Sequence, residues 1–321
     1  KSIREENGYL LKGKYQQYKS DKPYYGLNEA LGEFVNYILL EDESTISEFK
    51  EKLNKSLGEN IKLIAEMIPE LNYIIDTYAS LPALNPQESQ NRFNLTFLSF
   101  VKVICDFKSS VVLCLDDMQW ADLPTIKMVE NIICDNSINN ILIILSYRSN
   151  EVKKTHSLSL MLDDLNSKKI KNTAINLKPL LNLDITSMLS DTLGNTSTNI
   201  SELSQLIKEK TNGNPFFSKE FINNLYDSEM LYFDATAHEW SWDLKKIEER
   251  NITENVVDLI LRKISYLNEE TIEILKLSSC LEEIEVDKVS RIFNVSESSA
   301  KKAMQEAIEL GIILPIINKS D

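Results

Sequence analysis

Short apolar runs alternate with amphipathic stretches over the first 180 residues of this chain. The runs VVLCL and ILIIL have the length and β-branched content of strands that are buried on both faces. Because strands that alternate with helices form parallel sheets with right-handed crossovers, we expect an α/β fold here. The expected strands are residues 8–15, 111–115, 141–147 and 173–180, and the expected helices are 26–40, 87–107, 123–134 and 157–167, with two more within 45–78.

The pattern changes after Pro179. Helical spacing prevails from there to residue 228, interrupted at 211–217, and two alternating runs around a polar turn predict a hairpin at about 231–243. Four helical stretches follow, and the last two resemble a helix-turn-helix with a trailing wing. We therefore expect three parts: an α/β core over 1–180 with a helical insertion at about 42–90, a helical lid over 181–252, and a winged-helix-like all-α domain over 253–321.

Composition narrows the classes of function. The 321 residues carry a formal charge of −14, which disfavours general binding to nucleic acid or to an anionic membrane. We found neither an apolar run long enough to span a membrane nor a signal-peptide pattern. The four cysteines are not at C-x-x-C spacing, which indicates reduced thiols of a cytoplasmic protein. Two distant histidines give little support to zinc chemistry or a histidine-based triad.

The stretch GYLLKGKYQQY has the spacing of a phosphate-binding P-loop, because Gly8 is followed by Gly13 and Lys14. However, Tyr15 stands where a P-loop needs a small hydroxyl for Mg²⁺, and the bulky inner residues favour a strand. A P-loop also follows a buried strand, and only seven mostly polar residues precede Gly8. We interpret the stretch as a strand that runs into a polar turn, so we assign no P-loop in this chain.

The strongest chemical signal is VVLCLDDMQWAD, in which Asp116 and Asp117 end a buried strand and form a Walker B element. In such an element Asp116 would hold Mg²⁺ through its water shell, and Asp117 would polarise the attacking water. The alternative is an acidic pair that caps the next helix. Arg148 ends the neighbouring apolar strand, where a sensor residue would contact the γ-phosphate; the alternative is a surface salt bridge. We expect all three side chains at the carboxyl ends of the strands, where parallel sheets bind ligands.

The segment TNGNPFF is the second candidate. Gly213, Asn214 and Pro215 lie in a helical region after the sheet, where the proline would pack on an adenine ring. The alternative is an ordinary helix N-terminus with proline in its first turn.

These elements, in this order, resemble the STAND class of AAA+-related signalling ATPases. The similarity is strongest to the ATPase module between a Ser/Thr kinase domain and sensor and histidine-kinase domains in large bacterial signalling proteins. It covers nearly the whole chain, and LDDMQWAD and TNGNPFF are its specific parts. The further matching segments are GYLLKGKYQQY, KPYYGLNEAL, MIPEL, QNRFNLTF and YRSNEV.

The resemblance implies a P-loop NTPase-like sheet with helices on both faces, and ATP and Mg²⁺ as cofactors. It implies the roles given above to Asp116, Asp117, Arg148 and Pro215. It also identifies GYLLKGKYQQY as the family's second strand, so the P-loop strand and helix would precede Lys1. On this interpretation the chain by itself is inactive as an ATPase.

Three functions remain open at this point. The first is a nucleotide-dependent conformational switch, driven by slow hydrolysis or by nucleotide exchange, whose partners are other domains of the same polypeptide or other signalling proteins. The second is a scaffold that does not hydrolyse ATP. The third is a DNA-binding regulator, but residues 253–321 hold 8 Lys or Arg against 13 Asp or Glu, a net of −5, whereas DNA recognition usually shows a basic face.

Overall fold

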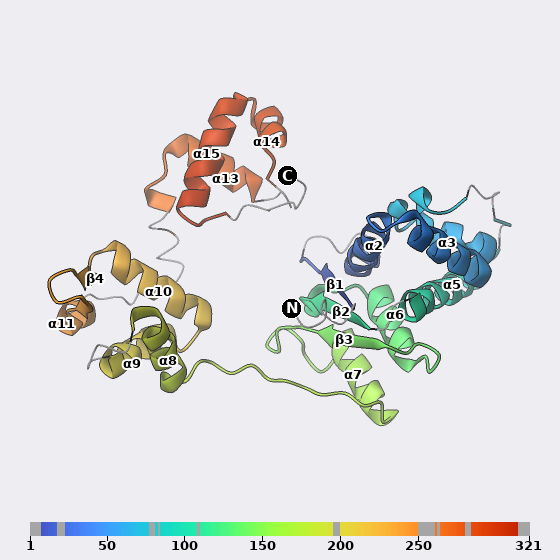
Figure 1. The fold of residues 1–321 in the computed structure, drawn as a ribbon, viewed down its shortest axis with the longest axis horizontal. Helices are drawn as coiled ribbons and strands as arrows, with labels where there is room; N and C mark the ends of the chain where they lie inside the picture. Colours follow the sequence, from blue (N-terminus) through green and yellow to red (C-terminus); the bar gives the residue numbers. More distant parts are fainter. Residues whose placement is uncertain are drawn as a thin grey trace. The chain divides into compact units, whose positions relative to one another are not determined.

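The computed structural model describes residues 8–17, 23–76, 81–82, 84–107, 110–194, 200–249, 261, 264–279 and 284–313. The chain divides into two compact units, residues 1–174 and 175–321, and each is described on its own (Figure 1).

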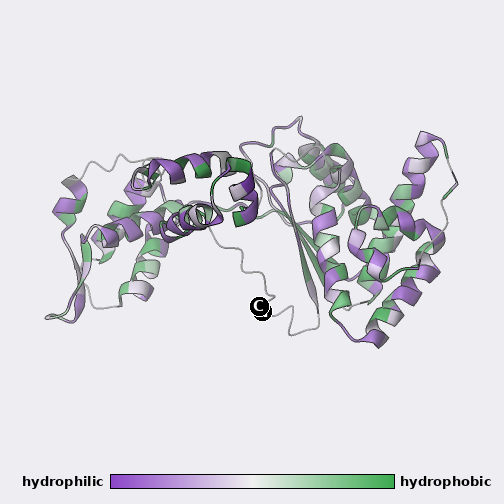
Figure 2. Cartoon of the chain, turned by 90° about the horizontal axis from the view of Figure 1, so that it is seen from above, coloured by the Kyte–Doolittle hydropathy of each residue, from purple (hydrophilic) through white to green (hydrophobic). Residues whose placement is uncertain are grey.

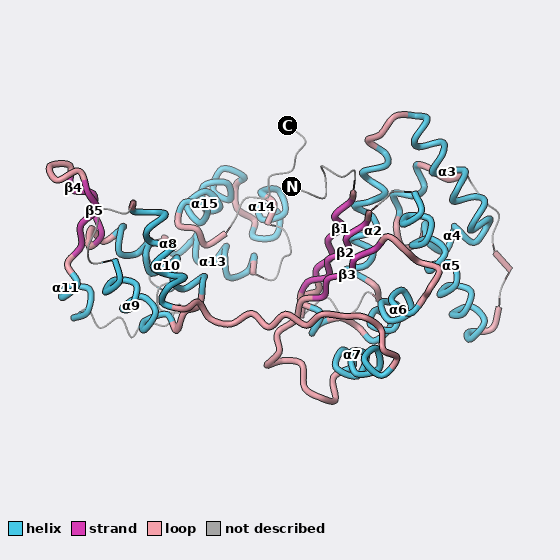
Figure 3. The backbone as a smooth tube through the Cα atoms, turned by 60° about the horizontal axis from the view of Figure 1, so that its bottom comes forward, coloured by secondary structure: helices cyan, strands magenta, loops and turns pink. Residues whose placement is uncertain are grey.

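The first unit is built on a parallel sheet of three strands (Figure 3). Its order is β1 (Tyr9–Lys14), β2 (Val111–Asp116) and β3 (Ile141–Leu145). The register pairs Lys14 with Asp116 and Leu115 with Leu145, so the three strands end at one edge. This confirms the α/β class and three of the expected strands.

The helices of the first unit agree closely with the apolar spacing that predicted them. Short 3₁₀ turns cover Gly58–Asn60, Pro69–Tyr73 and Met118–Trp120. The α-helices are α2 (Tyr25–Leu39), α3 (Glu43–Leu57), α4 (Ile61–Ala65), α5 (Pro86–Phe107), α6 (Leu123–Cys134) and α7 (Ser157–Ser167).

The sheet buries one face more completely than the other. Leu11, Leu113 and Leu115 are each at most 2% exposed. On the opposite face of β3, Leu142 and Ile144 are 58% and 46% exposed. The expectation of helices on both faces is therefore not met at this part of the second face. Figure 2 shows the apolar strands in green beside helices of mixed hydropathy.

Helix α2 covers both the buried face and the outer edge of β1. Its apolar residues recur at helical spacing and are buried, as Leu27, Leu31 and Phe34 show. Its glutamates accept hydrogen bonds from the outward N–H groups of β1: Lys12 N–H donates to Glu33 Oε2 at 3.2 Å, and Lys14 N–H donates to Glu29 Oε2 at 2.9 Å. These two N–H groups of the edge strand are thereby satisfied without another strand.

The predicted strand at 173–180 is wrong, since these residues form no ladder with any part of the chain that the structure describes. Ile175 and Leu177 are 81% and 88% exposed, because no neighbouring strand covers them. The boundary between the two units falls within this segment, at residues 174 and 175.

The second unit is mainly helical, with the expected hairpin between β4 (Leu231–Asp234) and β5 (Glu239–Trp242), which pair antiparallel. It has one apolar core around Leu203 and Phe221 and another around Val289. The first of the four helical stretches expected after Thr253 lies mostly outside the described residues, as does the wing beyond Ile313. The helices are α8 (Asn182–Leu193), α9 (Ile200–Thr211), α10 (Pro215–Asp227), α11 (Leu244–Glu249), α13 (Glu269–Ser278), α14 (Val286–Phe293) and α15 (Glu297–Glu309).

Candidate functional site

The two aspartates at the end of β2 have different environments. The side chain of Asp116 is 55% exposed, whereas that of Asp117 is only 16% exposed. The backbone turns between them, because Asp117 adopts a left-handed conformation with φ of 56°. This turn is fixed by Met118 N–H, which donates to the carbonyl oxygen of Ser146 at 2.9 Å. One carboxylate therefore faces solvent and the other faces the protein.

A lysine from the neighbouring strand contacts both carboxylates. Lys14 Nζ lies 3.6 Å from Asp116 Oδ2 and 3.5 Å from Asp117 Oδ2. The ladder register places it there, since Lys14 is the partner of Asp116 at the last position of β1. The P-loop spacing does not predict this contact; the signal in the sequence is the position of Lys14 near the end of an expected strand.

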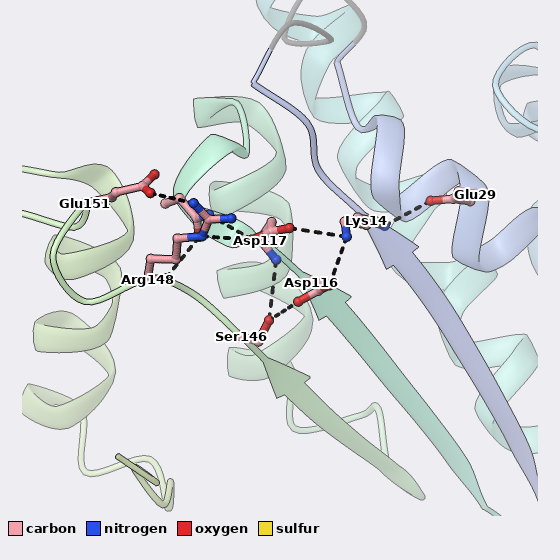
Figure 4. Close-up of polar contacts among 8 residues, drawn as sticks. Lys14, Glu29, Asp116, Asp117, Ser146, Arg148 and Glu151 are labelled. Carbon is pink, nitrogen blue, oxygen red and sulfur yellow. Dashed lines mark hydrogen bonds and ion pairs between the residues drawn. The ribbon is translucent and has the colours of Figure 1, made fainter. Parts of the chain in front are cut away.

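Arg148 approaches Asp117 from the other side. Its Nε lies 3.8 Å from Asp117 Oδ1, and one terminal nitrogen lies 3.1 Å from Glu151 Oε1. Its guanidinium group also stands 5.1 Å from the centre of the Trp120 ring. Figure 4 shows Lys14, Asp116, Asp117 and Arg148 in sequence along the ends of the three strands. The structure thus brings the three sequence-predicted residues together, while their catalytic roles stay predictions.

Two polar side chains that the sequence did not single out complete this edge. Ser146 Oγ donates a hydrogen bond to Asp116. Gln119 is 7% exposed, and its Nε2 donates to Asp117 Oδ1 at 2.9 Å. Its Oε1 accepts from the backbone N–H of Arg148 at 3.2 Å. Gln119 therefore ties the inner carboxylate to the backbone of the arginine.

His156 supports Gln119 from behind. Its Nδ1 accepts from the Leu158 N–H at 3.1 Å, as the N-terminal cap of α7. The proton then belongs on Nε2, which donates to the carbonyl oxygen of Gln119 at 3.1 Å. The histidine is thus a structural support with both ring nitrogens used.

Asp122 caps the N-terminus of α6. One carboxylate oxygen accepts from the Thr125 N–H at 2.8 Å, and the other accepts from the Tyr24 N–H at 3.2 Å. This aspartate therefore fastens the segment before α2 to the start of α6.

Gly213, Asn214 and Pro215 belong to the second unit and form the start of α10. Asn214 Oδ1 accepts from the Phe216 N–H at 3.0 Å, and Pro215 occupies the first turn, which is the alternative given above. Gly213 has φ of 68°, and its carbonyl oxygen accepts from the Leu180 N–H at 2.7 Å. A Cβ at this position would lie 2.4 Å from the Leu180 oxygen. A contact of these residues with nucleotide stays a prediction.

The donor set at the end of β2 suits one kind of metal. Among the described residues, no three His, Cys, Asp or Glu side chains gather as a metal-binding group. Mg²⁺ needs no such cage, because proteins usually hold it through one or two carboxylates, with waters and substrate phosphates as the other ligands. The exposed carboxylate of Asp116 fits that requirement.

The region that holds this aspartate pair is similar to a known protein family. The sequence model of the AAA ATPase domain family matches residues 1–144, which contain β1, β2 and the Asp116–Asp117 pair.

Two longer proteins are similar to this chain. It is 28% identical to the hybrid signal transduction histidine kinase G of Dictyostelium discoideum over 370 aligned residues, which cover 94% of this chain and 10% of that protein. It is 19% identical to the peroxide stress-activated histidine kinase mak3 of Schizosaccharomyces pombe, with 85% of this chain and 13% of that protein covered. The chain therefore spans about a tenth of the length of the curated relatives it matches.

Within the described residues, none of the helices combines the length and the apolar character that a membrane span requires.

Proposed function

We propose that this chain is a STAND-type ATP-binding module of a larger signalling protein. One observation carries the proposal: Asp116 and Asp117, which lie in the region that matches the AAA ATPase domain, meet Arg148, just beyond that region, at the carboxyl ends of adjacent parallel strands. Ligands of open α/β sheets bind at this edge. The similarity to two histidine kinases supports a signalling context.

Each of the three residues would have a separate role in binding and hydrolysing ATP. Asp116 would hold Mg²⁺ through water, which supplies positive charge to the phosphate oxygens. Asp117, held by Gln119, would orient the attacking water. Arg148 would contact the γ-phosphate, because its long side chain is 57% exposed beside the two aspartates. We assign no phosphate loop to Gly13 and Lys14, since both belong to a strand.

We also propose that Gly213, Asn214 and Pro215 bind nucleotide, with Pro215 against the adenine ring, so that the conformation of the protein would depend on its nucleotide state. Nucleotide binding would then shift a conformational equilibrium by its different affinity for the two states, which is how a switch works. We further propose a cytoplasmic location and other domains of the same polypeptide as partners.

The test is a titration of the full-length protein with a fluorescent ATP analogue and Mg²⁺. We expect saturable binding that Asp116→Asn weakens at fixed Mg²⁺, and slow hydrolysis that Asp117→Asn abolishes. The 321-residue chain alone should bind much more weakly. If the full-length protein binds no nucleotide, the proposal fails.

A scaffold is the second candidate, because Leu142 and Ile144 of β3 are exposed at a sheet edge suited to a partner. Failure of nucleotide binding together with capture of a partner at this edge would favour it. DNA binding has less support: on α15 the exposed Lys302 pairs with Glu306 at 3.9 Å. A gel shift with random duplex DNA at low salt is expected to show no complex.

A further inference from the structure

Lys14 stands where a cation neutralises both carboxylates of the candidate site. Its Nζ lies almost equally far from Asp116 and Asp117, at 3.6 and 3.5 Å (Figure 4). The two carboxylates would repel each other without a positive charge nearby, and Arg148 contacts only the inner one, at 3.8 Å. Lys14 therefore neutralises charge on both the outer carboxylate of Asp116 and the inner carboxylate of Asp117.

The backbone of Lys14 is fixed while its ammonium group is free to leave. The ladder register with Asp116 and the hydrogen bond from its N–H to Glu29 hold the backbone. The side chain is 56% exposed, and both ion pairs are longer than a hydrogen bond. Such a pair contributes little to stability and exchanges easily with other ions.

A metal ion would compete for the same carboxylate. Mg²⁺ at Asp116 would bring two positive charges close to the ammonium group, and like charges at this distance repel. We propose that Lys14 is a positioning residue that holds Asp116 and Asp117 in place until the metal arrives, and that it thereby sets the metal concentration at which the site fills. This inference rests on the proposed function.

The same lysine has an alternative role with the opposite consequence. If its ammonium group bound a phosphate oxygen of the nucleotide, it would help metal and nucleotide to bind together. Removing its charge would then weaken metal binding rather than strengthen it. The direction of the change therefore separates the two roles.

The probe is Mn²⁺, whose free concentration is measured by electron paramagnetic resonance with the full-length protein and a non-hydrolysable ATP analogue. Lys14→Met should lower the dissociation constant for Mn²⁺ about three- to tenfold, the range expected for losing a partly exposed charge. Lys12→Met is the matched control: Lys12 is also exposed on β1, with its N–H bonded to Glu33. It should leave the constant within about twofold.

The outcomes are distinct. Unchanged or weaker Mn²⁺ binding in Lys14→Met, with wild-type binding intact and lost in Asp116→Asn, would overturn the role of Lys14 alone. Absence of Mn²⁺ and nucleotide binding in the wild-type protein would overturn the proposed function and this inference with it. Lys14→Gln repeats the test with a polar side chain in case the methionine variant does not fold.

Discussion

Gly13 of β1 and Gly26 of α2 lie in backbone contact. A Cβ atom on Gly13 would stand 1.9 Å from the carbonyl oxygen of Gly26, and one on Gly26 would stand 2.6 Å from the ring of Tyr15. No side chain fits between these two backbones, because real Cβ atoms do not approach that closely. The glycine that suggested a P-loop is thus needed for packing a helix on a strand.

Gly13→Ala should therefore lower the free energy of unfolding of the first unit by about 3 kcal/mol, since backbone must move to admit the methyl group. Chemical denaturation of the purified protein measures this. Gly32→Ala on α2 is the matched control: its Cβ would meet Glu70 at an ordinary 3.6 Å. That change should raise stability by about 0.5–1 kcal/mol, because alanine favours a helix interior. Equal stability of both variants would contradict the contact.

Gln119→Ala should loosen the link between Asp117 and Arg148. It removes a buried donor and acceptor, which costs about 1–3 kcal/mol, and it leaves the Arg148 N–H without its side-chain partner. Amide hydrogen exchange at Arg148 should accelerate in the variant. Gln87→Ala on the exposed side of α5 is the control. It should change neither the free energy of unfolding nor the exchange rate at Arg148, since the hydrogen bond from Gln87 to Asn91 is long and exposed. Unaltered exchange at Arg148 would argue against the link.

Asp122→Ala should destabilise the first unit by about 1–2 kcal/mol, because the cap of α6 and the bond to the Tyr24 N–H are both lost. Asp122→Asn keeps a capping oxygen and should lose less than half of that. Thermal or chemical unfolding ranks the three proteins, and an alanine variant as stable as the asparagine variant would show that the cap contributes nothing.

Asp42, the N-terminal cap of α3, makes a contribution to folding stability that depends on pH. Hydrogen bonds from the Ser44 hydroxyl and then from the Thr45 N–H lower the pKa of its carboxyl. Since the folded pKa lies below the unfolded value of about 3.9, the carboxylate stabilises the fold at neutral pH, and this contribution is lost as the pH falls through the folded pKa. Asp42→Asn, which caps without titrating, should flatten the acid limb of stability measured between neutral and acid pH. The same acid limb in both proteins would refute this.

The strands of the sheet were predicted correctly where the local apolar pattern is enough to define a strand. VVLCL and ILIIL became β2 and β3 because each apolar run is paired in register. The segment 173–180 has a similar pattern and forms no strand, because a strand also needs a partner, and pattern does not supply one.

The candidate site was predicted only in part for a related reason. Asp116, Asp117 and Arg148 follow from strand ends, which the sequence marks. The strand register brings Lys14 to the aspartates, and the left-handed turn at Asp117 brings Gln119 to them. Both features depend on how segments far apart in sequence meet. No spacing along the chain encodes the distance from Lys14 to Asp116.

The glutamates of α2 make the two edges of the sheet unequal for the addition of another strand. The outward N–H groups of Lys12 and Lys14 already donate to Glu33 and Glu29. A strand added beside β1 would find no free donors at these two positions. Ile141–Leu145 on the opposite side has no further strand beside it within the described residues. An added strand, from the same polypeptide or from another molecule, would therefore find more free hydrogen-bonding groups beside β3, where Leu142 and Ile144 are exposed.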